Sequence, residues 1–172
     1  MVKTVGIVLV LVSAYAIGGL FARQVKEREK WLKELKMVLF LLQGELEYHQ
    51  MPLPEAMEAV GARHGGRMEG FFHSVAEELK KREGICMKEI WKQQANLVME
   101  NSPLSKEQKE EFAELGLYFA EADKEVRKNA LEFYFHRLEE EIITLRETGT
   151  DKAYLYRTLG MLGGMFLLIL IL

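Results

Sequence analysis

Residues 31–46, WLKELKMVLFLLQGEL, decide the fold class of this chain. Their apolar side chains recur at steps of three and four residues, the spacing that collects side chains on one face of an α-helix. The members of this face are Trp31, Leu32, Leu35, Val38, Leu39, Leu42 and Leu46. The pattern predicts an amphipathic helix that ends near Tyr48, before the turn residues Pro52 and Pro54.

A long uncharged stretch precedes this helix. Residues 4–22, TVGIVLVLVSAYAIGGLFA, hold 19 residues without a charged side chain, which is enough for a helix to cross a hydrocarbon layer about 30 Å thick. No proline separates this stretch from residues 31–46, so one helix can run through both. We predict a transmembrane helix over residues 1–22.

A cleaved signal peptide is the alternative for these residues. Ala14-Tyr15-Ala16 fits a cleavage site, and residues 5–12 would form a short apolar region before it. The single basic residue in front, Lys3, and the apolar residues that continue to Ala22 favour a retained span instead.

The chain also ends in uncharged residues. Residues 158–172 read TLGMLGGMFLLILIL, and residues 153–157 extend this apolar segment to 20 residues with Arg157 as its one charge. Arg157 can extend to the membrane interface, where Tyr154 and Tyr156 also fit. A buried core helix is the alternative, but a run that is apolar all round needs more enclosing protein than this chain provides. We predict a second transmembrane helix over residues 153–172.

The distribution of charge sets the orientation of these spans. The 23 basic and 26 acidic residues give a net charge of −3, and the mean hydropathy is −0.07. Every charged residue except Lys3 lies between residues 23 and 157, and six basic residues follow the first span within residues 23–36. The positive-inside rule then places residues 23–152 in the cytoplasm and both chain ends outside. This balance of charge excludes a nucleic-acid binder that relies on bulk positive charge.

No segment alternates apolar and polar residues over the length of a strand, so residues 23–152 are predicted to be helical throughout. Further helices are expected at about 54–64, 68–79, 87–98 and 105–119, where Ser105 and Gln108 form a capping box. A sixth starts near Asp123. Its apolar residues are Val126, Ala130, Phe133, Leu138, Ile142 and Leu145. Residues 148–151 either break this helix or lie within it. The predicted fold is all-α, a six-helix bundle flanked by N-terminal and C-terminal transmembrane helices.

Motifs that carry chemistry do not occur in the sequence. There is no Glu-x-x-His pair, no H-E-x-x-H, no G-x-S-x-G and no phosphate-binding lysine motif. His136 beside Glu139 and Glu140 is more typical of a solvated helix face than of a metal site. The single cysteine, Cys86, is predicted to be a buried structural thiol. We therefore expect no enzymatic activity, no cofactor and no metal.

Small residues on the two spans form a candidate packing surface. Ala14, Gly18 and Ala22 are spaced four residues apart, and so are Gly160 and Gly164. Small residues allow helix backbones to approach closely in lipid, where the hydrophobic effect does not drive association. We expect these ridges to pack on each other or on a helix of a partner protein.

An ordered set of segments resembles the stage III sporulation protein AB family of endospore-forming bacteria. The set comprises the basic segment after the first span, residues 42–48 leading into Pro52-Leu53-Pro54-Glu55-Ala56, Phe71-Phe72 before residues 76–79, residues 116–123, and Leu159-Gly160. The resemblance covers essentially the full chain and depends on the order of the segments rather than on any single motif.

The resemblance implies a function that composition does not show. Members of the family lie in the mother-cell membrane around the forespore, in a channel-like secretion apparatus that links the two cells. Their soluble domain is similar to the six-helix cytoplasmic domain of type II secretion F-platform proteins. Those proteins carry two such domains and three spans, so a platform built from this chain would need oligomerisation or other subunits. By the same analogy, the ATPase of the apparatus, its AA protein, is expected as a partner.

The sequence and the resemblance together predict a non-enzymatic membrane subunit of the mother cell–forespore channel that acts by assembly. Its expected partners are other proteins of the channel, membrane lipid and further copies of the chain, with no nucleic acid. A membrane-anchored sensor or regulatory domain, which transmits a signal through the long first helix, is the alternative.

Overall fold

The computed structural model describes the backbone of residues 2–81, 86–120 and 123–171. It describes the side chains of residues 6, 19, 20, 23–81, 86–120, 123–149 and 158. In the described residues every regular element is a helix, so the predicted all-α class is confirmed for that part of the chain.

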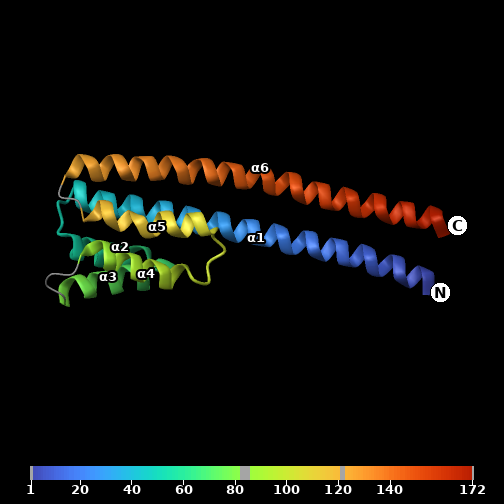
Figure 1. The fold of residues 1–172 in the computed structure, drawn as a ribbon, viewed down its shortest axis with the longest axis horizontal. Helices are drawn as coiled ribbons and strands as arrows, with labels where there is room; N and C mark the ends of the chain where they lie inside the picture. Colours follow the sequence, from blue (N-terminus) through green and yellow to red (C-terminus); the bar gives the residue numbers. More distant parts are fainter. Residues whose placement is uncertain (1, 82–85, 121–122, 172) are drawn as a thin grey trace. The chain divides into compact units, whose positions relative to one another are not determined.

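The described residues form six α-helices and one short 3-10 helix (Figure 1). They are α1 (Val2–Glu47), α2 (Leu53–His64), η1 (Gly66–Met68), α3 (Glu69–Lys81), α4 (Met87–Met99), α5 (Lys106–Phe119) and α6 (Lys124–Ile171). The long first helix is confirmed, because α1 is unbroken from residue 2 to residue 47. The sequence left open whether residues 148–151 break the last helix or lie within it. They lie within α6, which is unbroken.

The helices divide into two compact units. The larger unit, Lys30–Glu140, contains α2 to α5 and the adjoining parts of α1 and α6. The smaller unit consists of Met1–Glu29 and Glu141–Leu172. Within the smaller unit the two helices are joined by a hydrogen bond in which Arg146 Nε donates to Glu29 Oε1 over 2.7 Å.

None of the helices, over the residues that the structure describes, has an apolar stretch of the length needed to cross a membrane. The predicted spans, residues 4–22 and 153–172, consist almost entirely of residues whose side chains lie outside the described set. The predicted domain limits 1–22, 23–152 and 153–172 therefore stay predictions.

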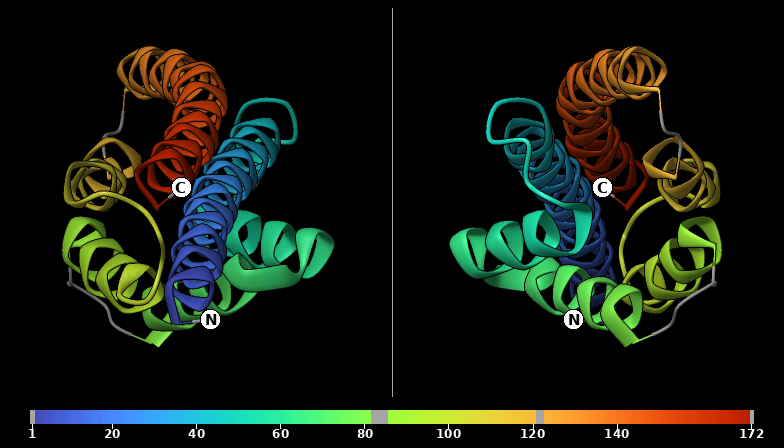
Figure 2. Two further views of the ribbon diagram at one scale, coloured as in Figure 1. Left: turned by 90° about the vertical axis from the view of Figure 1, so that its right-hand side faces the viewer. Right: turned by 90° about the vertical axis from the view of Figure 1, so that its left-hand side faces the viewer.

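The core of the larger unit is built on α1. All seven residues of the predicted apolar face between Trp31 and Leu46 are buried. The shorter helices pack in chain order, α2 on α3, α3 on α4 and α4 on α5. Viewed along the helices, they form an arc beside the part of α1 that belongs to this unit (Figure 2). The apolar face of α1 is therefore covered by helices that follow it directly in the sequence.

Aromatic side chains fill the contact between α3, α4 and α5. The ring of Trp91 lies 4.9 Å from those of Phe71 and Phe119, measured between centroids. The indole Nε1–H of Trp91 donates a hydrogen bond of 2.7 Å to the carbonyl oxygen of Phe112. A Cβ added at Gly116 would lie 2.5 Å from the Trp91 Cβ, so only glycine allows α4 and α5 to approach this closely.

The start of α5 confirms the predicted capping box. Ser105 Oγ accepts a hydrogen bond from the backbone N–H of Gln108, and Gln108 Oε1 accepts one from the backbone N–H of Ser105. Two donors at the helix start, which have no partner within the helix, are satisfied in this way.

Two predictions about burial are wrong. The sequence pattern assigns Val126 and Phe133 to the apolar face of α6, but both are exposed. Among the described side chains of α6 the buried ones are Leu131, Tyr134, Leu138 and Ile142, so Leu138 and Ile142 of the predicted face are confirmed. Both sets satisfy helical spacing, so contacts with other helices decide which one is buried. Cys86 is exposed rather than buried, because it is the N-cap of α4 and precedes the first buried residue of that helix, Met87.

An ion pair joins α2 to α3. Lys80 Nζ lies 2.7 Å from Glu58 Oε2, and both side chains are partly exposed. The hydrogen bond from Lys80 lowers the pKa of Glu58 below its ordinary value. A carboxyl group with a lowered folded-state pKa stabilises the fold above its unfolded pKa, and this stabilisation is lost as the pH falls through the folded value.

Gly116→Ala should destabilise the larger unit, because the added methyl group would overlap the buried Trp91 side chain. Overpacking of this kind costs about 1–3 kcal/mol. The measurement is the denaturant midpoint of the purified full chain, followed by circular dichroism. Gly70→Ala on α3 is the control, since nothing lies within 4 Å of its added Cβ, and it should leave stability equal or raise it by up to about 1 kcal/mol. Equal midpoints for the two variants would contradict the close contact.

Glu58→Gln should make the stability of the chain less sensitive to acid. The wild-type chain is expected to lose the contribution of the Glu58–Lys80 pair as the pH falls from about 6 to 3. The difference should be small because the pair is partly exposed to solvent. Thermal midpoints across this pH range measure it. Lys80→Gln removes the same ion pair and should reduce the change of the thermal midpoint with pH equally. If the midpoints of both variants change with pH as much as that of the wild-type chain, the pair does not contribute to stability.

Candidate partner-binding surface at the corner of α1 and α2

The segment that carries the family resemblance, Pro52 to Ala56, lies where the chain turns from α1 into α2. The turn is closed by the backbone N–H of Met51, which donates to the carbonyl oxygen of Glu45 over 3.2 Å. Gln50 has a positive φ of 49°, a conformation that reverses the chain direction. Pro52 is the N-cap of α2, and its carbonyl oxygen accepts a hydrogen bond from the N–H of Ala56.

The five residues of this segment divide between core and surface. Ala56 is fully buried and packs into the bundle. Leu53 and Pro54 are half-buried, and Pro54 occupies the first turn as predicted. Pro52 and Glu55 are exposed. The carboxylate of Glu55 lies in the first turn of α2, where negative charge interacts favourably with the helix dipole. The corner thus presents a proline and an acidic side chain on a rigid turn.

A buried carboxylate holds the corner in place. The side chain of Glu45, near the end of α1, is 3% exposed and accepts contacts from two largely exposed side chains. Arg63 NH1, from the last turn of α2, lies 2.6 Å from Glu45 Oε1. His49 Nδ1 lies 2.9 Å from Glu45 Oε2. Because a buried carboxylate is costly without partners, this cluster ties α2 to the end of α1.

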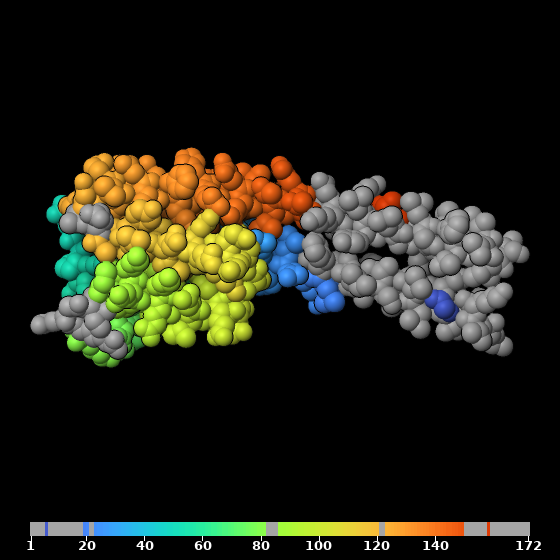
Figure 3. All heavy atoms as spheres, viewed as in Figure 1, coloured from blue at the N-terminus to red at the C-terminus, as the bar shows by residue number. Residues whose placement is uncertain are grey.

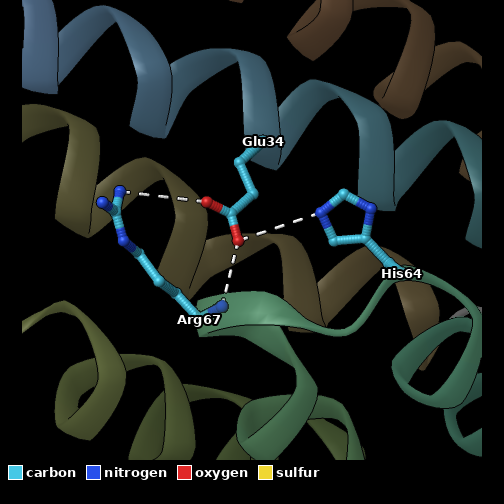
Figure 4. Close-up of polar contacts among 3 residues, drawn as sticks. All are labelled: Glu34, His64 and Arg67. Atoms are coloured by element: carbon cyan, nitrogen blue, oxygen red, sulfur yellow. Dashed lines mark hydrogen bonds and ion pairs between the residues drawn. The ribbon is translucent and has the colours of Figure 1, made fainter.

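A second carboxylate on α1, Glu34, holds the segment by which the chain leaves α2 (Figure 4). Glu34 Oε1 accepts the backbone N–H of Arg67 over 3.2 Å and lies 3.8 Å from His64 Nε2. The guanidinium of Arg67 lies 3.9 Å from Glu34 Oε2 and 5.2 Å from the centroid of the Trp31 ring. The chain leaving α2 is therefore fixed to α1 by charge, by a backbone hydrogen bond and by a cation–π contact.

Two glycines make the second contact possible. Gly65 and Gly66 have φ values of 64° and 72°, which side chains other than glycine rarely adopt. A Cβ added at Gly66 would also lie 3.1 Å from Glu34 Oε1. The Gly65-Gly66 pair thus ends α2 and lets the following backbone approach the Glu34 carboxylate.

The remaining candidate positions are placed as follows. Ala14, Gly18, Ala22, Gly160 and Gly164 lie outside the residues whose side chains the structure describes. His136 is exposed on α6, and Glu139 pairs with Lys36 at 3.2 Å rather than with the histidine. Among the described side chains, no group of three His, Cys, Asp or Glu residues is arranged to hold a metal ion.

Sequence analysis missed a set of exposed apolar side chains. Met37 and Phe40 on α1 and Phe133 on α6 are more than half exposed. The exposure of Met37 and Phe40 could have been predicted from the sequence, because neither residue belongs to the apolar face that recurs within residues 31–46. Exposed apolar side chains mark an interaction surface where they form a contiguous patch, whereas single ones are common on any protein.

The chain resembles known proteins over its whole length. The family model described as stage III sporulation protein AB matches residues 3–172. Stage III sporulation protein AB of Bacillus subtilis (strain 168) is 22% identical over 171 residues, which cover 99% of each chain. No solved structure matches this chain. Because the family model spans both long helices and the corner between α1 and α2, the chain belongs to the stage III sporulation protein AB family, and this family implies a role in sporulation.

Proposed function

We propose that this chain is a non-enzymatic membrane subunit of the channel-like apparatus between mother cell and forespore, and that it acts in assembly. The observation that carries the proposal is the family match along the whole chain, combined with an all-helical larger unit. The buried carboxylate of that unit, Glu45, is held in internal ion pairs, as is the largely buried Glu34. Because these two carboxylates are used inside the unit, the surfaces that it offers to partners are its helix faces and turns.

The proposed location is the mother-cell membrane, with the larger unit in the cytoplasm. The uncharged residues 4–22 belong to α1 and the apolar residues 153–172 almost entirely to α6, and both helices continue unbroken into the larger unit. Six basic residues within 23–36 support this orientation. In this arrangement Ala14, Gly18 and Ala22 on one span, and Gly160 and Gly164 on the other, provide surfaces for helix packing in lipid.

The proposed partner is the ATPase of the apparatus, its AA protein, and the corner at Pro52 to Ala56 is the proposed contact. Within the larger unit this corner lies where α1 ends and α2 begins, at the opposite end of that stretch of α1 from the point where the helix enters the unit (Figure 1). Pro52 and Glu55 are exposed there, on a turn that the Glu45 cluster makes rigid. A rigid turn reduces the conformational entropy lost on binding.

A regulatory function is the second candidate, and the unbroken course of α1 from residue 2 to residue 47 favours it. Such a helix can transmit a displacement from one end to the other. A regulator would bind its partner only in one signalling state, whereas an assembly subunit should bind constitutively. Capture of the partner in the pull-down experiment below, where no signal is supplied, would favour assembly over regulation.

The topology can be tested with a probe that the chain already carries. Cys86 is the single cysteine in the sequence and is exposed. In vegetative cells that produce the full chain, a membrane-impermeant maleimide should leave Cys86 unlabelled until the cells are lysed. The matched variant, Cys86→Ser with Val2→Cys, should be labelled in intact cells, because residue 2 is proposed to lie outside. Labelling of Cys86 in intact cells would reverse the orientation.

The partner contact can be tested with the purified full chain in detergent. The wild-type chain should capture the AA protein, and Glu55→Lys should weaken capture about tenfold by reversing an exposed charge at the centre of the contact. Glu114→Lys, which reverses an exposed charge on α5, is the matched control and should bind normally. Circular dichroism should show both variants folded. Equal capture by the two variants would contradict the contact at the corner, and absence of capture by the wild-type chain would contradict the partner.

A further inference from the structure

The turn that follows α1 exposes an aromatic side chain almost completely. Tyr48 is 84% exposed, more than any other large apolar side chain that the structure describes. No side-chain hydrogen bond or ring contact joins it to the described residues. Figure 3 shows atoms of this turn, coloured teal, at an edge of the larger unit. The ring is therefore available to a second molecule.

Gln50, two residues further on, has a backbone conformation that favours glycine or asparagine. Its φ is 49°, and among the described residues it is the one residue other than glycine with a positive φ. A glutamine in this region costs more free energy than a glycine would. Its side chain is exposed, and the described residues offer it no hydrogen bond. Strain at a residue whose side chain has no role inside the chain indicates a role outside it.

The backbone on both sides of these residues is fixed. The N–H of Tyr48 donates to the carbonyl oxygen of Gly44 over 3.0 Å, and the N–H of Met51 donates to that of Glu45 over 3.2 Å. The side chain of Glu45 is itself 3% exposed and held in ion pairs. Tyr48 and Gln50 are thus presented on a turn that loses little conformational freedom on binding.

The charges around the turn indicate what can cover it. Residues 48–54, YHQMPLP, contain no acidic residue, lysine or arginine. A carboxylate lies on each side of this run, that of Glu47 half-buried and that of Glu55 exposed, while the nearby Arg63 is paired with Glu45. Anionic lipid headgroups, or the same corner of a second copy, would meet these carboxylates with like charge. The turn therefore fits a protein surface that carries lysine or arginine around an apolar slot.

We propose that Tyr48 is the anchor of the corner in the partner ATPase and that Gln50 is a second residue that determines specificity. The Tyr48 ring fills an apolar slot flanked by lysine or arginine side chains, and the Gln50 amide hydrogen-bonds at its edge. Tyrosine is enriched among the few residues that dominate binding energy, because a large ring is buried with few rotatable bonds. The contact then extends from Glu55 across the turn to Tyr48.

The inference rests on the proposed function for the identity of the partner, and it adds the chemistry by which that partner is recognised. The first experiment measures capture of the AA protein by the purified full chain in detergent. Tyr48→Ala should lower capture about tenfold, because the anchor is lost. Tyr48→Phe keeps the ring and should stay within about threefold of the wild-type chain.

Phe133→Ala is the matched control for the ring. It removes an aromatic side chain that is 70% exposed on α6, away from the corner, and should capture normally. Circular dichroism and the thermal midpoint should show the variants equally folded, since both rings are exposed in the single chain. Equal capture by Tyr48→Ala and Phe133→Ala would overturn the proposal, and so would a loss with Tyr48→Phe as large as with Tyr48→Ala.

Gln50→Asn separates recognition from a structural role. Asparagine adopts positive φ more readily than glutamine, so the thermal midpoint should stay equal or rise. The amide is withdrawn by one methylene group, so capture should fall about threefold. Stability and binding then change in opposite directions. Unchanged capture, or a fall in the thermal midpoint together with capture, would overturn the role of Gln50.

Photo-cross-linking distinguishes failure of this inference from failure of the proposed function. The probe p-benzoylphenylalanine is incorporated at position 48, or at position 133 as the control, in sporulating cells, and the products are mapped by mass spectrometry. A product at position 48 alone, on apolar residues of the AA protein flanked by lysine or arginine, is the expected result. The same chemistry on another protein would keep the anchor and refute the ATPase as partner.

The remaining outcomes count against the anchor. Products only between copies of the chain, only with lipid, or equally at both positions would overturn the proposal. Capture of the AA protein that Glu55→Lys weakens and Tyr48→Ala does not would leave the proposed function standing and overturn this inference alone.

Discussion

The larger unit depends on one constraint, which is that α1 carries an unbroken apolar face from Trp31 to Leu46 and must cover it. Helices α2 to α5 are each too short to bury such a face alone. They cover it by packing in chain order as an arc beside α1. Local connections are sufficient for this arrangement, because each helix contacts the one that follows it.

Two carboxylates then fix where α2 lies on that face. Glu45 and Glu34 are on the same helix; Glu45 holds Arg63 from the last turn of α2, and Glu34 holds Arg67 from η1. Because the first is buried and the second largely so, losing either partner would leave a poorly solvated charge. Their engagement in internal pairs explains why acidic residues in a helical bundle need not indicate catalysis. The exposed Glu55 is left as a charge that a partner can contact.

The sequence predicted the elements of this unit well because their signals are local. The apolar face of residues 31–46, the first-turn position of Pro54 and the capping box of Ser105 and Gln108 all follow from spacing within one helix, and the structure confirms them. Family membership was also accessible from ordered segments. The ion pairs were not, since Glu45 and Arg63 are far apart in the sequence and nothing local relates them.

The sequence by itself determined the helical class, the continuous α1 helix and the family. Only the tertiary structure decided that α6 buries Leu131, Tyr134 and Leu138 and exposes Phe133. The buried residues Leu131, Tyr134 and Leu138 and the exposed residues Val126 and Phe133 both recur at helical spacing. A helix without neighbours cannot select which of these two faces is buried. Contacts of α6 with α1 and α5, seen at Phe135 and Arg137, make that choice. The side of α6 that faces solvent is therefore a product of packing, because spacing along one helix carries no information about which side the other helices will cover.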